Sequence, residues 1–438
     1  MKRKPQAVDL ADYQKPEDQL GILYGLPREV NFCTSCVISN QRPNSAIEFL
    51  HTEESTKETI RFDEDGLCDA CRATEAKRDT DWDERDRMLR ELCDKHRRTD
   101  GRFDCIVPGS GGKDSIYASL VLKEEYGMHP LTITWAPHIY TDWGWKNFQN
   151  WIHAGLDNCL FTPNGKVHRL LSRLALENLF HPFQPFIFGQ KNLAPKIAAQ
   201  YGVNLVFFGE NEAEYGNPVE EMDTAIRDSK YFALEDQSNI YLGGTSVQQL
   251  LDDYGLEKNE LEFYMPAKPE LLENSDVEVH YLGFYKKWHP QSCYYYSRDK
   301  ANFIPSPHRT QGTYSKYNSI DDRIDDFHYL TSYIKFGIGR ATYDGAQEIR
   351  SGDIERHEGV ALVKRYDGEY PEIFSDEIFK YLSINEHDFP VASKMFEQPE
   401  IDKDYFLQMA DGFRSPHLWK HENGAWALRH AVWDDEQK

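Results

Sequence analysis

The sequence has no uninterrupted apolar run approaching the roughly 18 residues that a membrane-spanning helix needs. It opens with MKRKPQAVDLADYQKPEDQL, which is charged and then polar and lacks the apolar core of a secretory signal peptide. These two absences predict a protein without a membrane span that resides in the cytoplasm.

Basic residues are scarce relative to acidic ones. There are 50 Lys and Arg residues against 73 Asp and Glu residues, a formal net charge of −23 at pH 7. Nucleic-acid binding depends on Lys and Arg that neutralise phosphates, and this chain has no clear basic stretch interleaved with aromatic residues. We therefore expect no nucleic-acid partner.

Cysteine is present in a patterned form. Of the eight cysteines, four form two CxxC pairs separated by 31 residues: Cys33, Cys36, Cys68 and Cys71. Four thiolates delivered in this way suit a tetrahedral structural zinc site, and an iron–sulfur cluster is the alternative. Neither pair opens a helix after a strand, so thioredoxin-like redox chemistry fits poorly. The single cysteines, which are more typical of small buried apolar residues, are Cys93, Cys105, Cys159 and Cys293.

The middle of the chain alternates between strand and helix patterns. Apolar runs at 103–108, 131–135 and 203–208 predict strands, and residues 79–98, 113–126 and 193–202 predict helices. This order predicts an α/β fold with a parallel sheet and helices on both faces. We expect a polar leader (1–30), a four-cysteine zinc ribbon (31–78), a connecting helix (79–100), an α/β domain (101–300) and a mainly helical C-terminal region (301–438).

The stretch VPGSGGKDSIY, residues 107–117, directly follows the first predicted strand of that domain. It is not a Walker A loop, because Val107 occupies the position of the first glycine and Asp114 that of the Ser or Thr. It still has the parts of a phosphate site. Glycines let backbone N–H groups approach an anion, a helix begins at the same point, Lys113 adds a cation and Asp114 a carboxylate for Mg²⁺.

The string SGGKDS resembles the PP-loop of the ATP pyrophosphatases, which cleave ATP between the α and β phosphates. The resemblance implies an adenylating enzyme that uses ATP and Mg²⁺, with Lys113 stabilising the leaving phosphates and Asp114 helping to hold the metal ion. It assigns pyrophosphate binding to Ser110, Gly111, Gly112, Asp114 and Ser115. Thr134 and Trp135 fall where this superfamily holds adenosine, although a place in the core is equally compatible with them.

Four further stretches, at 33–49, 61–75, 206–216 and 312–371, resemble the N-acetyl sugar amidotransferases of the WbpG/PseA type. The resemblance covers most of residues 31–390, apart from the insert LHTEESTKETI at 50–60. It implies that the acetamido group of an N-acetyl sugar or nucleotide sugar is adenylated on oxygen and displaced by ammonia to give an acetamidino group. Such enzymes serve lipopolysaccharide or flagellin-glycan biosynthesis.

The implied source of ammonia is a separate glutaminase with a cyclase-like companion, resembling the subunits of imidazole glycerol phosphate synthase. This chain has no cysteine at position 2 to act as a glutaminase nucleophile. Two other functions remain open. A tRNA-modifying PP-loop enzyme predicts AMP formation stimulated by tRNA, and an ATP-binding assembly subunit predicts no release of pyrophosphate.

Substrate-side candidates follow from position. Gly209, Glu210 and Asn211 follow a predicted strand, where Glu210 and Asn211 could face the α-phosphate or the sugar amide, or form a solvated acidic loop. His328 lies in an apolar helix pattern that favours a packed core residue. The remaining candidates for anionic groups, each also compatible with an ordinary surface position, are Gln190, Lys191, Lys316, Lys335, Arg340, Arg350 and Arg356.

Overall fold

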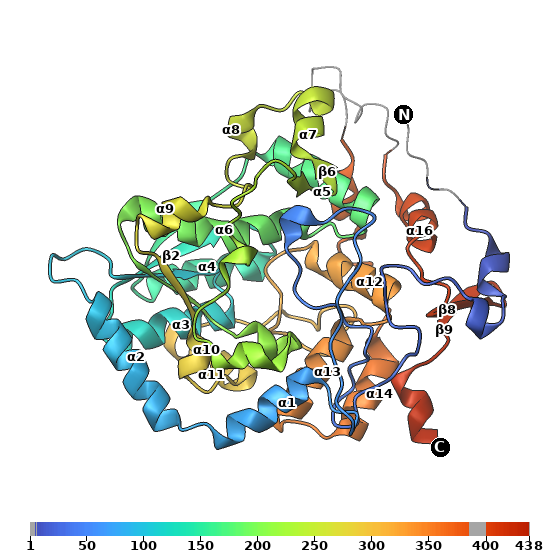
Figure 1. Ribbon diagram of the computed structural model, residues 1–438, viewed down its shortest axis with the longest axis horizontal. Helices are drawn as coiled ribbons and strands as arrows, with labels where there is room; N and C mark the ends of the chain where they lie inside the picture. Colours follow the sequence, from blue (N-terminus) through green and yellow to red (C-terminus); the bar gives the residue numbers. More distant parts are fainter. Residues whose placement is uncertain (1–4, 6, 385–399, 438) are drawn as a thin grey trace.

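A computed structural model describes residue 5 and residues 7–384 and 400–437. A five-stranded parallel sheet forms the core of its α/β part, in the left half of the view in Figure 1. The strand order is β3-β2-β1-β4-β7, and all four neighbouring pairs are parallel. The strands are β1 (Cys105–Pro108), β2 (Pro130–Trp135), β3 (Asp157–Phe161), β4 (Leu205–Phe208) and β7 (Glu278–Tyr281). The predicted α/β class with a parallel sheet is confirmed.

Helices cover both faces of this sheet. Those up to the last sheet strand are α1 (Asp69–Ala76), α2 (Trp82–His96), α3 (Lys113–Glu124), α4 (Asp142–His153), α5 (Gly165–Leu179), α6 (Gln184–Tyr201), α7 (Val247–Tyr254), α8 (Lys258–Leu261) and α9 (Pro269–Glu273). Those after it are α10 (Leu282–Tyr285), α11 (Pro290–Ala301), α12 (Asp325–Phe336), α13 (Arg340–Ser351), α14 (Arg356–Tyr366), α15 (Ser375–Leu382) and α16 (Lys403–Asp411). No helix of the described residues is both long and apolar enough to cross a membrane.

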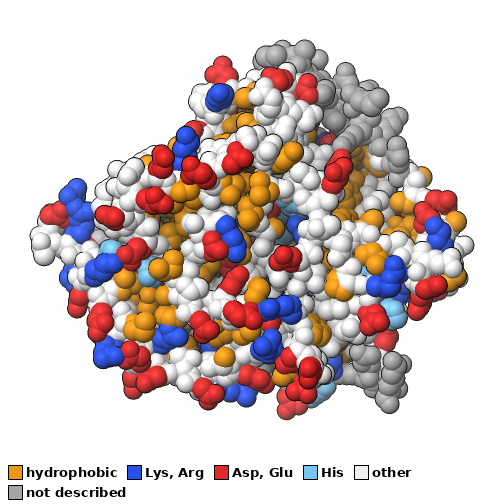
Figure 2. All heavy atoms as spheres, viewed as in Figure 1, with side chains coloured by type: hydrophobic (Ala, Val, Ile, Leu, Met, Phe, Trp, Pro, Cys, Tyr) orange, Lys and Arg blue, Asp and Glu red, His pale blue; other side chains and the backbone are white. Residues whose placement is uncertain are grey.

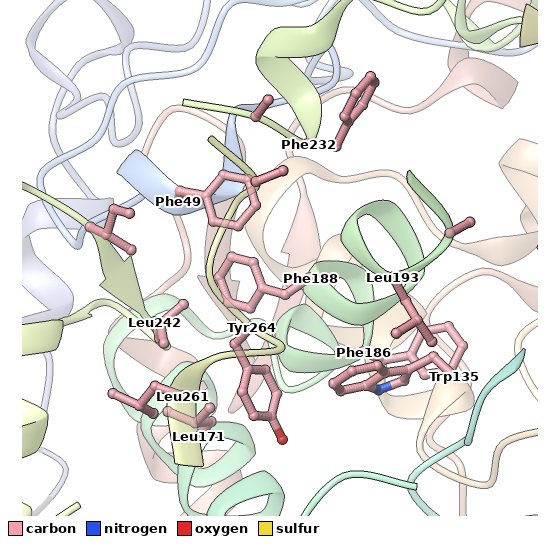
Figure 3. Close-up of a cluster of buried hydrophobic side chains, with 14 of the residues drawn as sticks. Phe49, Trp135, Leu171, Phe186, Phe188, Leu193, Phe232, Leu242, Leu261 and Tyr264 are labelled. Atoms are coloured by element: carbon pink, nitrogen blue, oxygen red, sulfur yellow. The ribbon is translucent and has the colours of Figure 1, made fainter. Parts of the chain in front are cut away.

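Side chains that alternate along the strands build two separate cores. Ile106 of β1 and Val206 of β4 face α5 and α6, in the cluster shown in Figure 3. Their neighbours Val107 and Phe207 face the opposite side, where they pack with α2 and α3. This period of two, with both faces apolar, is what a parallel sheet buried between helices requires.

Two short hairpins interrupt the helical pattern. They are β5 (Tyr241–Leu242) with β6 (Thr245–Ser246), and β8 (Trp419–Glu422) with β9 (Ala425–Leu428). Tyr13 and Leu26 from the N-terminal segment are buried against Leu418 and Trp419, so this segment lies beside the β8–β9 hairpin (Figure 1). The described part of the expected polar leader is therefore packed against the C-terminal region.

Helix α6 begins nine residues before the predicted start at residue 193. Pro185 stands in its first turn, where proline costs no helical hydrogen bond, and Gly202 ends it in the left-handed conformation. Near its start, Gly189 lies against Trp135. A Cβ at this glycine would come within 1.9 Å of the indole Cδ2.

We expect Gly189→Ala to destabilise the protein by about 1–3 kcal/mol, because the added methyl overpacks a closed core. Trp135 has little room to move, since it stacks on Phe161 at 4.9 Å and meets Tyr264 edge-on at 5.3 Å. Urea unfolding measures the change. Gly165→Ala is the control, because no atom lies within 4 Å of a Cβ there. Equal stability of the two variants would contradict this packing.

Candidate active site

A cavity of about 540 Å³ lies at the carboxyl edge of the sheet. The segments that follow β1 and β4 form one side of it. The other side is formed by α12 and α13 together with residues 31–78, which carry the two CxxC pairs and are called the cysteine segment below. Seven Lys or Arg side chains line it against four Asp or Glu side chains: Arg42, Lys57, Lys113, Lys191, Lys335, Arg340 and Arg350 against Glu48, Asp114, Glu210 and Asp344. The cavity therefore reverses the charge balance of the whole chain and suits anionic ligands.

The glycine-rich loop between β1 and α3 is fixed by close packing. Gly111 has φ +86°, and a Cβ there would lie 2.6 Å from the Cα of Phe148. A Cβ at Gly109 would lie 2.1 Å from the Cβ of Ser115. Gly112 caps α3, and no atom lies within 4 Å of the point that a Cβ would occupy there. The loop thus leaves the N-terminus of α3 open to an anion at Gly112.

Lys113 and Asp114 begin α3 and line the cavity. The Lys113 Nζ lies 2.5 Å from Asp114 Oδ2. Burial lowers the pKa of Lys113, but the charges of Asp114 and Glu210 outweigh it and hold that pKa above its ordinary value. Asp114 Oδ1 is buried and has no hydrogen-bond partner among the described residues. A carboxylate oxygen in this position fits Mg²⁺, which prefers oxygen ligands and is shared with phosphates.

Glu210 reaches the same cavity from the end of β4. Its Oε1 accepts a hydrogen bond from Trp288 Nε1 at 3.0 Å. Burial, together with the charge of Asp114, raises the pKa of Glu210 to about 7. Gly209 packs against the Trp288 ring, and Asn211 caps a short helix by accepting a bond from Ala213 N. Of these three predicted residues, only Glu210 lines the cavity.

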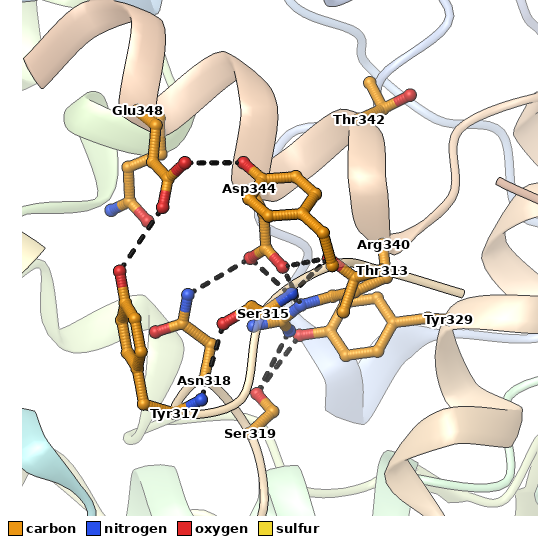
Figure 4. A network of polar contacts seen from close by, with 12 residues as sticks. Thr313, Ser315, Tyr317, Asn318, Ser319, Tyr329, Arg340, Thr342, Asp344 and Glu348 are labelled. Carbon is orange, nitrogen blue, oxygen red and sulfur yellow. Dashed lines mark hydrogen bonds and ion pairs between the residues drawn. The ribbon is translucent and has the colours of Figure 1, made fainter. Parts of the chain in front are cut away.

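The facing wall is a polar network built on Arg340, shown in Figure 4. Its guanidinium bonds to Asp344 at 3.1 Å and to Ser319 Oγ at 3.1 Å, and it lies 4.2 Å from the Tyr329 ring centroid. Asp344 also accepts a hydrogen bond from Thr313 Oγ1 at 2.6 Å. These contacts hold Arg340 in one orientation while it lines the cavity.

The remaining predicted residues divide into two groups. Those that line the cavity are Gln190, Lys191, His328, Lys335 and Arg350. Lys316 instead points to Pro307 O at the surface, and Arg356 donates to Cys36 O. His328 stacks on His181 at 4.9 Å, and burial lowers its pKa to about 4, so it is a neutral, packed histidine at the cavity wall.

Thr134 and Trp135 belong to the core. Thr134 is fully buried and accepts a hydrogen bond from Asn158 Nδ2, while Trp135 packs among aromatic rings (Figure 3). Neither lines the cavity. Ser110 lies in the loop beside Asp321, to which it is hydrogen-bonded, and Ser115 Oγ donates to Gly112 O at 3.0 Å.

Several cavity residues were not predicted from the sequence. The insert at 50–60, noted only as a departure from the family pattern, contributes His51 and Lys57. Glu48, just before the insert, lies 3.5 Å from His51 Nδ1, which lies 3.4 Å from Lys57 Nζ. The insert itself was the available signal, because extra residues at a site often carry function.

The four cysteines of the two CxxC pairs come together in one buried cluster, which does not line the cavity. Their sulfur atoms all lie within 4.8 Å of one another, and none is in a disulfide. Cys33 and Cys71 have their sulfurs 3.7 Å apart, and Cys36 and Cys68 3.8 Å apart. Four sulfurs about 2.3 Å from one tetrahedral ion lie about 3.8 Å apart. The cluster therefore fits one metal ion such as zinc better than a multi-iron cluster, whose iron atoms would spread the sulfurs.

We expect Cys68→Ser to abolish zinc binding and to lower the free energy of unfolding by several kcal/mol, because structural metal binding is coupled to folding. Elemental analysis and thermal unfolding measure the two effects. The control is Cys159→Ser, since Cys159 is only half-buried and lies outside the cluster. Full zinc content in the Cys68 variant would exclude this cluster as the metal site.

Glu210 gives a pH prediction. Its folded-state pKa of about 7 exceeds the ordinary 4.5, so the folded protein holds this proton more tightly than the unfolded chain. The resulting stabilisation is complete below about pH 4.5 and is lost as pH rises through about 7. Glu210→Gln should therefore gain stability relative to the wild type as the pH rises from about 4.5 to about 7, measured by urea unfolding. Glu235→Gln, at an exposed position, is the control, and its free energy of unfolding should follow the same pH dependence as that of the wild type. The same pH dependence in the Glu210 variant would refute the raised pKa of Glu210.

On the face seen in Figure 2, Lys and Arg side chains are interspersed among Asp and Glu rather than gathered in one area. The cationic character of the lining is thus a property of the cavity and not of this outer face. The groups that favour an anionic ligand lie inside the cavity.

An uncharacterized protein of Methanocaldococcus jannaschii, MJ1599, is 30% identical to the chain over 84 residues. The aligned part is 19% of this chain and 30% of that protein, so the chain spans less than a third of the curated relative it matches. Residues 311–432 match the family model of the C-terminal domain of WbpG-like LPS biosynthesis proteins. This region includes α12 and α13, which supply the polar network and Lys335, Arg340 and Arg350. The match supports the WbpG-type resemblance for the wall that faces the glycine-rich loop.

Proposed function

We propose that this protein is an ATP-dependent amidotransferase of polysaccharide biosynthesis that converts an acetamido group of an N-acetyl sugar or nucleotide sugar to an acetamidino group. One observation carries the proposal. A single cavity joins the open N-terminus of α3, with Lys113 and Asp114, to the WbpG-like wall that contains Arg340. A phosphate-handling loop and a sugar-biosynthesis domain thus share one reaction space.

The α/β part would act as a PP-loop ATP pyrophosphatase. The backbone of Gly111 and Gly112 and the N-terminus of α3 would bind the β and γ phosphates, with Ser110 and Ser115 beside them. Lys113 would offset charge on the leaving pyrophosphate, and Asp114 would hold Mg²⁺ through the free Oδ1. When bound, Mg²⁺ neutralises phosphate charge and helps orient the ATP chain.

The chemistry requires activation, because the oxygen of an acetamido group is a very poor leaving group. In the proposed reaction the amide oxygen attacks the α-phosphorus of ATP, and the bond to the β-phosphate oxygen breaks to release pyrophosphate. Ammonia then adds to the imidate carbon, the C–O bond to AMP breaks, and the amidine remains. The pocket contributes orientation and charge stabilisation, which are the main sources of rate in phosphoryl chemistry.

Glu210 is suited to take the proton that the attacking nitrogen must lose. It lies in the cavity with Asp114, and its pKa of about 7 makes it a usable base at neutral pH. Ammonia itself is scarce at neutral pH. A separate glutaminase with a cyclase-like companion would supply it, which makes this chain the synthetase component of a complex.

The direct test is pyrophosphate release from Mg·ATP and ammonium salt, with a panel of nucleotide-linked di-N-acetyl sugars and, separately, with bulk tRNA. Release that needs a sugar, and a product one mass unit lighter from replacement of C=O by C=NH, would establish the reaction and name the substrate. Release that needs tRNA would replace the proposal with a tRNA-modifying activity. ATP binding without release under every condition would leave a non-catalytic subunit.

Asp114→Asn should reduce pyrophosphate release by at least about 100-fold, since the variant removes the charge that would hold the metal ion. Thermal unfolding measures separately the cost of losing its ion pair with the buried Lys113. The matched control is Asp157→Asn. Asp157 is exposed at the start of β3, on the edge of the sheet away from the cavity, and its variant should keep full activity. Retained turnover in the Asp114 variant would show that the loop is not the phosphate site.

A further inference from the structure

The cysteine segment forms part of the cavity wall. Ile38, Arg42, Ile60 and Ala70 line the cavity from this segment. Behind them the cysteines share a hydrophobic core with α13 and α14. In Figure 1 this blue segment lies beside the orange helices α13 and α14. The four cysteines and this part of the cavity wall therefore belong to one segment and share one hydrophobic core.

Arg42 is a buried cation without an acidic partner. It is 8% exposed, its Nη1 donates to Pro43 O at 3.1 Å, and its Nε has no hydrogen-bond partner among the described residues. Gly216 presses against it, since a Cβ there would lie 2.7 Å from Nη1. No carboxylate forms an ion pair with Arg42 in the part of the chain that the structure describes. A buried guanidinium in this state lacks the counterion that such charges normally have.

Arg350 lies close to Arg42 and lines the same cavity. Its Nη1 donates to Cys36 Sγ at 3.9 Å and its Nη2 to Glu214 O at 3.3 Å. The cysteine cluster thus holds this guanidinium in place. Burial lowers the pKa of Arg42, and the positive charge of Arg350 lowers it further, so an anion between the two would relieve their repulsion.

Arg42 and Arg350 are linked through neighbouring residues to the end of the cavity that contains Lys113, Asp114 and Glu210. Gln347, one turn before Arg350 on α13, donates to Tyr215 OH at 3.2 Å. Tyr215 lines the cavity together with Glu210, and burial and the charge of Glu210 raise the pKa of Tyr215. Tyr215 precedes the glycine that presses against Arg42. A ligand at the Lys113 end can therefore extend its charged groups toward Arg42 and Arg350.

We propose that Arg42 and Arg350 form a phosphate-binding subsite of the cavity, in which the four-cysteine cluster positions the second arginine. The ligand is a phosphate-bearing molecule, because two guanidinium groups line the cavity and neither has a carboxylate partner among the described residues, and guanidinium groups favour phosphate oxygens. The phosphate belongs either to ATP or to the nucleotide carrier of the sugar. This inference rests on the proposed function for the identity of these ligands, but its test needs binding alone.

The test is isothermal titration of ATP, inorganic pyrophosphate and a uridine diphosphate N-acetyl sugar into wild type, Arg42→Gln and Arg350→Gln, with zinc content measured for each. We expect at least tenfold weaker binding of the ligand whose phosphates use the subsite, with zinc retained in the Arg42 variant. A loss confined to ATP and pyrophosphate, or to the sugar nucleotide, supports the subsite and names its ligand.

Arg356→Gln is the matched control. Arg356 also donates to the cysteine segment, at Cys36 O, but does not line the cavity, so its variant should bind all three ligands within about twofold of wild type. Unchanged binding in the Arg42 and Arg350 variants, or an equal loss in the Arg356 variant, would overturn the subsite. If Arg42→Gln does not fold, Arg42→Lys keeps the charge and loses the fork, and it should still weaken binding severalfold.

These outcomes separate the subsite from the reaction. If no sugar supports pyrophosphate release but the arginine variants still lose ligand affinity, the subsite stands and the proposed reaction falls. If sugar-dependent release occurs and the arginine variants bind normally, only the subsite falls.

Discussion

The buried carboxylate of Asp322 joins the segment that follows β2 to the segment that leads into α12, a helix of the cavity wall. It accepts hydrogen bonds from His138 N at 2.6 Å and from His138 Nδ1 at 2.7 Å, and further bonds from Ile139 N and Ile324 N at 3.2 Å. The first three donors follow β2, whereas Asp322 leads into α12. A buried charge bonded to this many donors is stable in place, and removing its partners would leave it uncompensated at a cost of several kcal/mol.

The backbone at the start of α4 also packs closely against the residue before Asp322. Thr141 N donates to Asp321 O at 3.0 Å, and a Cβ at Gly144 would lie 2.5 Å from the Cα of Asp321. Helix α4, which begins here, also presses Phe148 against Gly111 of the glycine-rich loop. The loop and the WbpG-like region are thus positioned through the same helix. The cavity between them is a product of this packing and not of either part alone.

Much of the α/β framework could be predicted from the sequence because its signals are local. The strands β1, β2 and β4 are short apolar runs, α2 carries its charges in the order that the helix dipole favours, and the cysteine spacing specifies a metal site. The edge strands β3 and β7 were not predicted. The residues of β3 are exposed or half-buried and none is fully buried, so they lack the continuous apolar run of a central strand.

The sequence predicted the residues of the candidate site only where they belong to a recognisable motif or directly follow a predicted strand. Lys113, Asp114 and Glu210 follow strands whose carboxyl ends meet, and the structure brings them into one cavity. The Glu48–His51–Lys57 group could not be found in this way, because its place depends on contacts far along the chain, such as that of Gln184 Nε2 with Glu48 Oε2. Thr134 and Trp135 show the opposite case. Their positions at the end of a strand were compatible with a binding role. The close packing of Gly189 against the indole of Trp135 instead places Trp135 in the core.

The charge of the chain and the charge of the cavity have different physical roles. A net charge of −23 governs encounters over distances of about a Debye length, whereas a ligand inside the cavity meets groups at contact distance and at low dielectric. An acidic exterior is therefore compatible with a site for phosphates. An anionic substrate is therefore attracted only once it has entered the cavity, and its recognition depends on the cations that are held in place there. Arg340 is held by Asp344 and Arg350 by Cys36, so the polar network and the cysteine cluster each fix one cation of the cavity, at opposite ends of α13.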